Sequence, residues 1–268
     1  MNKADWEKHE LECINYLQQN FGMDGYIQFK HLGGSDSTKS DIAVYKDRKF
    51  LFCMDAKMES SQSGQFVLLP DEKSKTFIFS EANKSELNKE ALAIINEMNN
   101  NFEKYKSPGT KSILLDINQT ISANWITSHY KALKVKFFIS KGTDFVIVPI
   151  DKFEDYFHIE ANYRQKKSGS RNPPQKDLTT IESLLEKGNC IFNQLHFDKS
   201  YLNVNISNQK DIFVLGENDK NYQLKRLEQN LYRITKLSST NNPNVIFQIS
   251  LKRQQDPDDL EQFKAMLK

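Results

Sequence analysis

Residues 49–58 read "KFLFCMDAKM", an apolar run that is followed at once by Asp55, Ala56 and Lys57. The run predicts a buried β-strand. Because alternate side chains of a strand share a face, Asp55 and Lys57 point the same way. A carboxylate and an ammonium at the end of a buried strand are costly unless they are paired or bind a ligand. The end of this strand is therefore a candidate site, and an exposed ion pair of little energetic value is the alternative.

A second carboxylate comes from the preceding strand, "DIAVYK" (41–46), which a turn at Asp47-Arg48 joins to the first in a predicted hairpin. Counting outward from the turn places Asp41 opposite residues 54 to 56. Two adjacent carboxylates repel each other and raise one pKa unless a cation lies between them. A hard divalent ion such as Mg²⁺, which prefers oxygen ligands, removes the conflict. Asp36 competes with Asp41 for this place, but it lies in a loop rather than at a strand start.

A third acid comes from the first predicted helix, residues 4–20, whose apolar face contains Trp6, Cys13 and Leu17. Glu10 falls in the middle of that stripe, whereas Glu12 points about 150° away at 3.6 residues per turn. A glutamate inside an apolar stripe needs a partner. Lys57, or water on a metal ion, is the expected one, and helix capping or a surface salt bridge is the alternative.

The order of the remaining patterns predicts an α/β fold with a mixed sheet flanked by helices. The predicted order is helix, three strands, helix, strand, helix, strand, with the later elements at 80–105 (helix), 112–117, 122–133 (helix), 135–140 and 144–150. We expect a first domain over residues 1–163, a basic loop or linker over 164–177, and a smaller β-rich module over 178–268. A last helix is expected to begin with Asp256 as its cap and Pro257 at its first position.

These residues resemble the PD-(D/E)XK nuclease superfamily, and the chain looks most like a type II restriction endonuclease. The resemblance rests on Glu10, Asp41 and Asp55-Ala56-Lys57 in that order of elements, over about residues 4–140. It implies a restriction-endonuclease-like core and Mg²⁺-dependent hydrolysis of phosphodiesters with one or two ions. Asp41, Asp55 and the carbonyl of Ala56 would hold the metal, Lys57 would act on the attacking water, and Glu10 would support them. The chain departs from the pattern in having no proline before Asp41.

Three polar stretches are candidates for contact with double-stranded DNA. Loop 33–40, "GGSDSTKS", offers hydroxyls and one cation to phosphates through Ser35, Ser37, Thr38 and Lys39. Gln62 and Gln65, in the loop-like stretch "SSQSGQF" (60–66), could contact phosphate or a base edge. The basic stretch 163–171 supplies Arg164, Lys166, Lys167 and Arg171, which suit phosphate neutralisation. Plain polar turns and a solvated linker are the alternatives.

Composition excludes several other classes of function. The net charge of the 268 residues is +2, and the three cysteines are too scattered for a disulfide framework or a zinc site. The five histidines are isolated from one another, and no nucleotide-binding GxxxxGK[ST] loop occurs. No leader or membrane-spanning stretch is legible, so we expect a cytoplasmic protein without a nucleotide cofactor. A homodimer would suit a palindromic target. A structure-specific nuclease and a non-catalytic DNA-binding protein remain the alternative functions.

Overall fold

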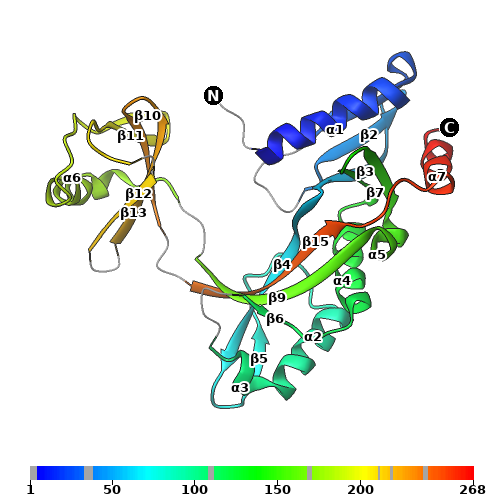
Figure 1. Ribbon diagram of the computed structural model, residues 1–268, viewed down its shortest axis with the longest axis horizontal. Coiled ribbons are helices and arrows are strands. Elements are labelled where there is room, and N and C mark those ends of the chain that lie inside the picture. Colours follow the sequence, from blue (N-terminus) through cyan, green and yellow to red (C-terminus); the bar gives the residue numbers. More distant parts are fainter. Residues whose placement is uncertain are drawn as a thin grey trace. The chain divides into compact units, whose positions relative to one another are not determined.

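The chain divides into two compact units (Figure 1). The computed structural model describes residues 5–32, 39–107, 112–167, 171–210, 212–217, 220–237 and 241–268. Unit 1 comprises Met1–Arg164 and Pro243–Lys268, and unit 2 comprises Gln165–Asn242. The structure thus corrects the expected C-terminal module, because residues 243–268 belong to unit 1 and only the part before them is separate.

Unit 1 contains a mixed five-stranded sheet in the order β1-β2-β3-β7-β8. Strands β3 and β7 are parallel, and the other neighbours are antiparallel. The strands are β1 (Ile27–His31), β2 (Ile42–Lys46), β3 (Lys49–Met58), β7 (Val135–Lys141) and β8 (Phe145–Pro149). The expectation of a mixed α/β architecture is confirmed.

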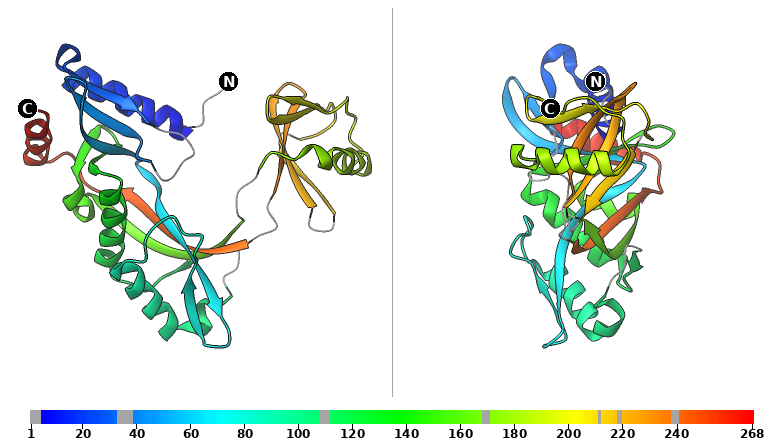
Figure 2. Two further views of the ribbon diagram at one scale, coloured as in Figure 1. Left: turned by 180° about the vertical axis from the view of Figure 1, so that it is seen from behind. Right: turned by 90° about the vertical axis from the view of Figure 1, so that its left-hand side faces the viewer.

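Alternating side chains along β3 serve two different cores. Phe52 and Met54 belong to the core that contains residues of α1 (Asp5–Phe21) and α7 (Pro257–Leu267), whereas Cys53 belongs to the core that contains residues of α4 (Gln119–Ala132). Figures 1 and 2 show α1 and α4 on opposite sides of the sheet. Because Asp55 and Lys57 have the same parity as Cys53, the strand directs both of them toward α4.

A second sheet of unit 1 has the order β5-β4-β15-β9-β6. Its strands are β4 (Ser60–Asp71), β5 (Thr76–Phe79), β6 (Ile113–Leu114), β9 (Phe157–Lys167) and β15 (Asn241–Leu251). Only Glu59 separates β3 from β4, so the chain passes from one sheet into the other next to Lys57. Phe247 of β15 stacks on Trp125 of α4 and Phe66 of β4 packs against it at a tilt, which joins this sheet to the α4 core.

Shorter elements complete unit 1 around these sheets. They are η1 (Met23–Gly25), α2 (Lys89–Asn100), α3 (Phe102–Tyr105), η2 (Ile150–Lys152) and α5 (Phe153–Tyr156). The helix expected over 80–105 begins only at Lys89, because the side chain of Asn88 accepts a hydrogen bond from the N–H of Ala91 and caps it. The expected cap of the last helix is confirmed, with Asp256 accepting from the N–H of Asp258 and Pro257 in first position.

Unit 2 is inserted between β9 and β15, which are neighbours in the second sheet. It has its own antiparallel sheet in the order β10-β11-β14-β13-β12, and α6 packs Ile181, Leu184 and Leu185 into its core. Its elements are η3 (Gln175–Asp177), α6 (Leu178–Lys187), β10 (His196–Asp198), β11 (Tyr201–Asn205), β12 (Ile212–Glu217), β13 (Lys220–Glu228) and β14 (Leu231–Lys236).

Two segments that were expected to be loops are strands. Residues 60–66 begin β4, and residues 164–167 end β9, so the basic stretch is only partly a loop. The prediction failed because polar residues fill both segments, and their pairing partners lie far away in the sequence. Within the described part of the chain, no helix is both long and apolar enough to cross a membrane.

Candidate active site

A one-residue bulge in the β2–β3 hairpin brings Asp41 next to Asp55. Near the turn, Tyr45 pairs with Phe50, but the next pair is Val44 with Phe52, so Leu51 is the extra residue. Without this shift, counting from the turn would place Asp41 opposite Met54. With it, Ile42 pairs with Met54 and the next residues outward are Asp41 and Asp55. The backbone N–H of Ala56 donates to Oδ2 of Asp41 at 2.9 Å, which fixes that carboxylate at the strand end.

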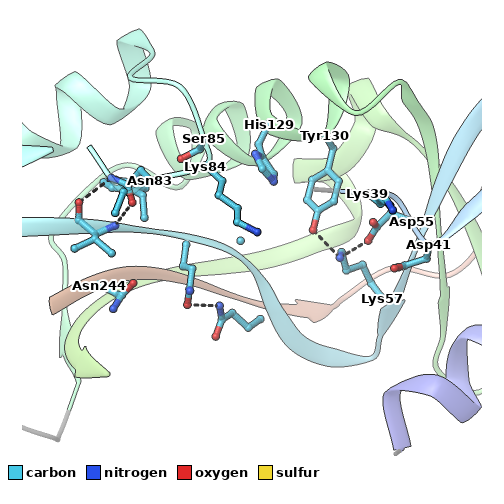
Figure 3. Close-up of a pocket in the computed structure, with 16 residues that line it drawn as sticks. Lys39, Asp41, Asp55, Lys57, Asn83, Lys84, Ser85, His129, Tyr130 and Asn244 are labelled. Atoms are coloured by element: carbon cyan, nitrogen blue, oxygen red, sulfur yellow. Dashed lines mark hydrogen bonds and ion pairs between the residues drawn. The ribbon is translucent and has the colours of Figure 1, made fainter. Parts of the chain in front are cut away.

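Lys57 is held at the same place by two partners (Figure 3). Its Nζ forms an ion pair with Oδ1 of Asp55 and donates a hydrogen bond to Oη of Tyr130 at 2.8 Å. Asp55 is 3% exposed and Lys57 is 8% exposed, so the pair is buried in a cavity wall rather than solvated at a strand end. The alternative of an exposed ion pair is therefore wrong.

The environment favours positive charge at this strand end. Burial raises the pKa of Asp55, and the negative charge of Asp41 raises it further, while Lys57 opposes both effects. Burial lowers the pKa of Lys57, but Asp55, Tyr130 and Asp41 together outweigh this effect and raise it above its ordinary value. Lys57 is therefore an ammonium at neutral pH, while the pKa of the neighbouring Asp55 is raised to about 7. An additional cation at this place would favour the charged form of Asp55.

The donor set fits a hard divalent ion. Apart from the ion pair with Lys57, Oδ1 of Asp55 is a buried acceptor that receives no hydrogen bond. Among the described residues, no group of three or more His, Cys, Asp or Glu side chains could hold a metal by itself. Two carboxylates and the carbonyl of Ala56 would thus leave positions for water or phosphate oxygen, which suits Mg²⁺ because it keeps several waters.

Glu10 is buried as expected, but its partner is a different residue. It is 7% exposed, and its Oε2 lies 2.6 Å from Nε2 of His31 at the end of β1. Burial raises the pKa of Glu10, the hydrogen bond with His31 opposes this, and the charge of Asp41 raises it further. The expected contact with Lys57 is therefore wrong, since Lys57 is held by Asp55 and Tyr130. Trp6, which was expected in the apolar stripe, is exposed at the start of the helix.

The site opens into a cavity of about 450 Å³ between the two sheets and α4 (Figure 3). The polar residues that line it are Lys39, Asp41, Asp55, Lys57, Gln62, Gln65, Asn83, Lys84, Ser85, His129, Tyr130 and Asn244. Three lysines and two aspartates therefore face one space. A chain of phosphates beside a bound cation matches this mixture of charges.

A bulge at Gly64 turns both predicted glutamines toward this cavity. Gln62 pairs with Gln248 and Gln65 pairs with Ile246, so β4 has one residue more than β15 between these pairs. Gly64 has a φ of +94° there. In a regular strand, residues three apart lie on opposite faces. The bulge brings both side chains to one face, where Nε2 of Gln62 donates to Oε1 of Gln65 at 3.0 Å.

The other predicted DNA contacts are not brought together in the described structure. Ser35, Ser37 and Thr38 lie outside the described residues, while Lys39 lines the cavity. Arg164 is half-buried and ends the first segment of unit 1, and Arg171 is exposed in unit 2, where its backbone bridges to Lys236. Lys166 and Lys167 belong to β9, and their side chains are outside the described part. A role of this basic stretch in DNA contact stays a prediction.

Sequence reasoning missed several residues of the cavity. Tyr130 and His129 lie in the helix predicted over 122–133, to which no site role was given, and Lys84 lies in the segment assigned to the helix over 80–105. His31 was treated as isolated, yet it pairs with Ile42 across β1 and β2 and therefore lies next to Asp41. Extending the hairpin count from β2 to β1 is the one sequence signal that could have found His31.

Comparison with known proteins identifies one solved structure with the same fold over nearly the whole chain. It is the HhaI endonuclease in complex with DNA, with 35% sequence identity and a TM-score of 0.84. The match covers 98% of this chain and 99% of that chain. No protein-family model matches the chain, and no curated protein sequence matches it significantly. The fold is thus that of a restriction endonuclease.

Proposed function

The chain belongs to the family of the HhaI endonuclease, and from this premise we propose that it is a Mg²⁺-dependent endonuclease that cuts double-stranded DNA at a specific sequence. In this proposal it is a type II restriction enzyme with a PD-(D/E)XK site. The observation that carries the proposal is the group of Asp41, Asp55 and Lys57 where the start of β2 meets the end of β3. Asp55 and Lys57 are buried, Asp41 is half-buried, and the group opens to a cavity large enough for a phosphate and its neighbours.

Each of these residues has a task that follows from its place. Asp41 and Asp55, with the carbonyl of Ala56, would hold the ion beside the scissile phosphate. Lys57 keeps its proton because Asp55 and Tyr130 stabilise the ammonium, so it orients a water or phosphate oxygen and offsets negative charge as the bond breaks. The contact between Glu10 and His31 holds α1 against the end of β1, where His31 pairs with Ile42 at the start of β2. When bound, Mg²⁺ supplies the positive charge that polarises the phosphate.

Recognition of a sequence would use polar groups that line the same cavity. Gln62 and Gln65 present amide groups from one face of β4, and amides can pair bidentately with adenine. Lys39 and Lys84 offer charge to the phosphates on either side of the scissile one.

A cleavage assay on long unmethylated bacteriophage DNA tests the proposal. We expect discrete fragments with Mg²⁺ and none after the metal is removed with EDTA. Lys57→Ala should slow cleavage by roughly 100-fold or more, because it removes a charge that acts on the developing negative charge. The affinity for DNA should stay within about threefold, since only one of many phosphate contacts is lost.

Lys264→Ala is the matched control, because this lysine lies on α7, pairs with Glu261 on the same helix and does not line the cavity. It should cut at the wild-type rate. A Lys57→Ala protein that cuts as fast as wild type would remove the assignment of the site. Cutting of branched DNA alone would instead identify a structure-specific nuclease, and binding without any cutting would identify a DNA-binding protein. Sedimentation velocity with and without a cleaved duplex tests whether a homodimer forms.

A further inference from the structure

The ammonium of Lys57 has three N–H donors, and two of them are already engaged. One faces the carboxylate of Asp55, and another is given to the hydroxyl of Tyr130 at 2.8 Å. Figure 3 shows the Tyr130 hydroxyl reaching Lys57 from α4, on the other side of the cavity from β3. A tetrahedral ammonium that is held by two fixed partners has a fixed direction for its third N–H. A lysine held by Asp55 alone could rotate about that one contact.

We propose that Tyr130 is a positioning residue for cleavage: its hydroxyl holds Nζ of Lys57 so that the third N–H is aimed at the water or phosphate oxygen beside Asp41 and Asp55. This inference rests on the proposed function of Lys57. It assigns to α4 a part in the chemistry that is separate from binding DNA or the metal.

Tyr130 is itself rigidly held, which a positioning residue requires. It is 7% exposed, and its ring packs edge-on against Phe138 with centroids 5.1 Å apart at 81°. Phe138 lies on β7 directly beside Asp55 in the parallel β3–β7 pair. Phe138 therefore contacts the ring of Tyr130 and lies beside Asp55 in the sheet, so it connects the two partners of Lys57. The centroid of the Tyr130 ring also lies 4.6 Å from Nζ of Lys57, so the ammonium contacts both the ring and the hydroxyl.

A purely structural hydrogen bond is the competing explanation, and unit 1 contains a matched example. Tyr156 is fully buried, and its hydroxyl donates to Oδ2 of Asp259 at 2.7 Å. This bond also joins a tyrosine hydroxyl to a charged side chain. It connects α5 to α7, however, and neither Tyr156 nor Asp259 lines the cavity. Loss of the hydroxyl at Tyr156 should therefore lower stability without affecting the chemistry.

The experiment compares Tyr130→Phe with Tyr156→Phe, wild type and Lys57→Ala as full-length proteins. The measurements are the single-turnover cleavage rate with Mg²⁺ at saturating enzyme, the Kd for the same duplex with Ca²⁺ in place of Mg²⁺, and the melting temperature. We expect Tyr130→Phe to cut roughly 10- to 100-fold more slowly, because a small misplacement of a reacting group costs that much. Its Kd should stay within about threefold of wild type, and Tyr156→Phe should cut at the wild-type rate.

Other outcomes overturn the inference in distinguishable ways. A Tyr130→Phe protein that cuts at the wild-type rate, or one that loses affinity but keeps its rate, removes the positioning role and leaves the proposed function intact. Equal slowing of both variants, in step with their loss of melting temperature, shows a structural bond only. Absence of Mg²⁺-dependent cleavage by wild type removes the proposed function and this inference together. Assays well below the lowest melting temperature keep unfolding out of the rates.

Discussion

Two glutamates on the first helix show how strongly position decides the role of a residue. Glu10 is buried and bonded to His31, whereas Glu12 is exposed and pairs with Lys141 at 3.1 Å. They are two residues apart, so the helix turns them to different sides of α1. The raised pKa of Glu10, which burial causes, means that the folded protein disfavours its charge. A buried glutamate with a raised pKa lowers the stability of the folded protein, so its presence is expected to serve function. Because Glu10 lies near Asp41, we expect that function to be in the active site.

Glu10→Gln should therefore separate stability from activity. The free energy of unfolding at pH 7.5 should equal or exceed that of wild type, because the amide removes a charge whose burial is unfavourable. Cleavage should slow by roughly 10-fold or more, as for other residues that support metal ligands. Urea unfolding and single-turnover cleavage measure the two effects, with Glu12→Gln as the control that changes neither. A large loss of stability, or wild-type cleavage, would contradict this view of Glu10.

The aspartates and the lysine could be predicted from the sequence, whereas their partners could not. Counting along the local hairpin predicted that Asp41 lies beside Asp55. The bulge at Leu51 shifts the pairing by one residue, and the prediction held only because it gave a range of positions, 54 to 56. Tyr130 reaches Lys57 across 73 residues of chain. No local periodicity encodes such a contact, since it depends on how α4 packs on the finished sheet. No pattern in the sequence therefore predicted that the Tyr130 hydroxyl lies next to the charge of Lys57.

At the scale of elements, β4 connects the site to the surface that would read DNA. It follows β3 after one residue, and its bulge at Gly64 directs Gln62 and Gln65 toward the cavity. Gly64 also lies directly against Trp125 of α4: a Cβ atom there would come within 2.6 Å of Cζ3 of the indole. Both the positive φ and this close approach require glycine. The bulge thus fixes the distance between β4 and α4 as well as the direction of the glutamines.

Gly64→Ala should destabilise the protein and impair cleavage. The strained φ costs about 1 kcal/mol and the contact with Trp125 adds roughly 1–3 kcal/mol. Gly25→Ala is a matched control, because Gly25 has a nearly equal φ of +92° and its Cβ would meet nothing within 4 Å. Gly25→Ala should lose only the stability that the strained φ costs, about 1 kcal/mol, and should cut at the wild-type rate. Equal losses of stability in urea unfolding would show that the indole moves aside easily.

The predictions for β4 and β15 failed for two different reasons: β4 was not recognised as a strand, and β15 was assigned to the wrong sheet. The first half of β4 is made of Ser, Gln and Gly, whose β propensity is low, and the bulge interrupts its alternation. β15 has a typical strand composition, yet it pairs with β4 after an intervening 169 or more residues rather than with the strands just before it. Local patterns identify a strand but not its sheet, which is why residues 243–268 were assigned to the wrong unit.

At the scale of the whole molecule, the two units have separate hydrophobic cores. The core of unit 2 consists of its own residues, among them Leu185, Leu202 and Ile234, and the two cores of unit 1 contain none of them. Unit 2 also has its own charge pair, between the buried Asp177 and the half-buried Lys236. Nζ of Lys236 donates to Oδ2 of Asp177 at 2.6 Å, and the hydroxyl of Tyr222 donates to the same oxygen at 3.0 Å. Each unit thus has its own hydrophobic core, from which we expect unit 2 to unfold separately.

Asp177→Asn should therefore destabilise unit 2 alone, and only where the carboxylate is charged. Burial opposes ionisation of Asp177, but the bonds from Lys236 and Tyr222 outweigh it and lower its pKa. The stabilisation is thus complete above the unfolded pKa of about 4 and is lost as the pH falls through the lower folded value. At pH 7 we expect a loss of about 1–3 kcal/mol.

Both tryptophans, Trp6 and Trp125, belong to unit 1. Urea unfolding followed by circular dichroism should shift, while tryptophan fluorescence should keep its midpoint. A common shift of both signals would mean that the units unfold together, and a difference between variant and wild type that persists well below pH 4 would mean that the Asp177 charge is not its source.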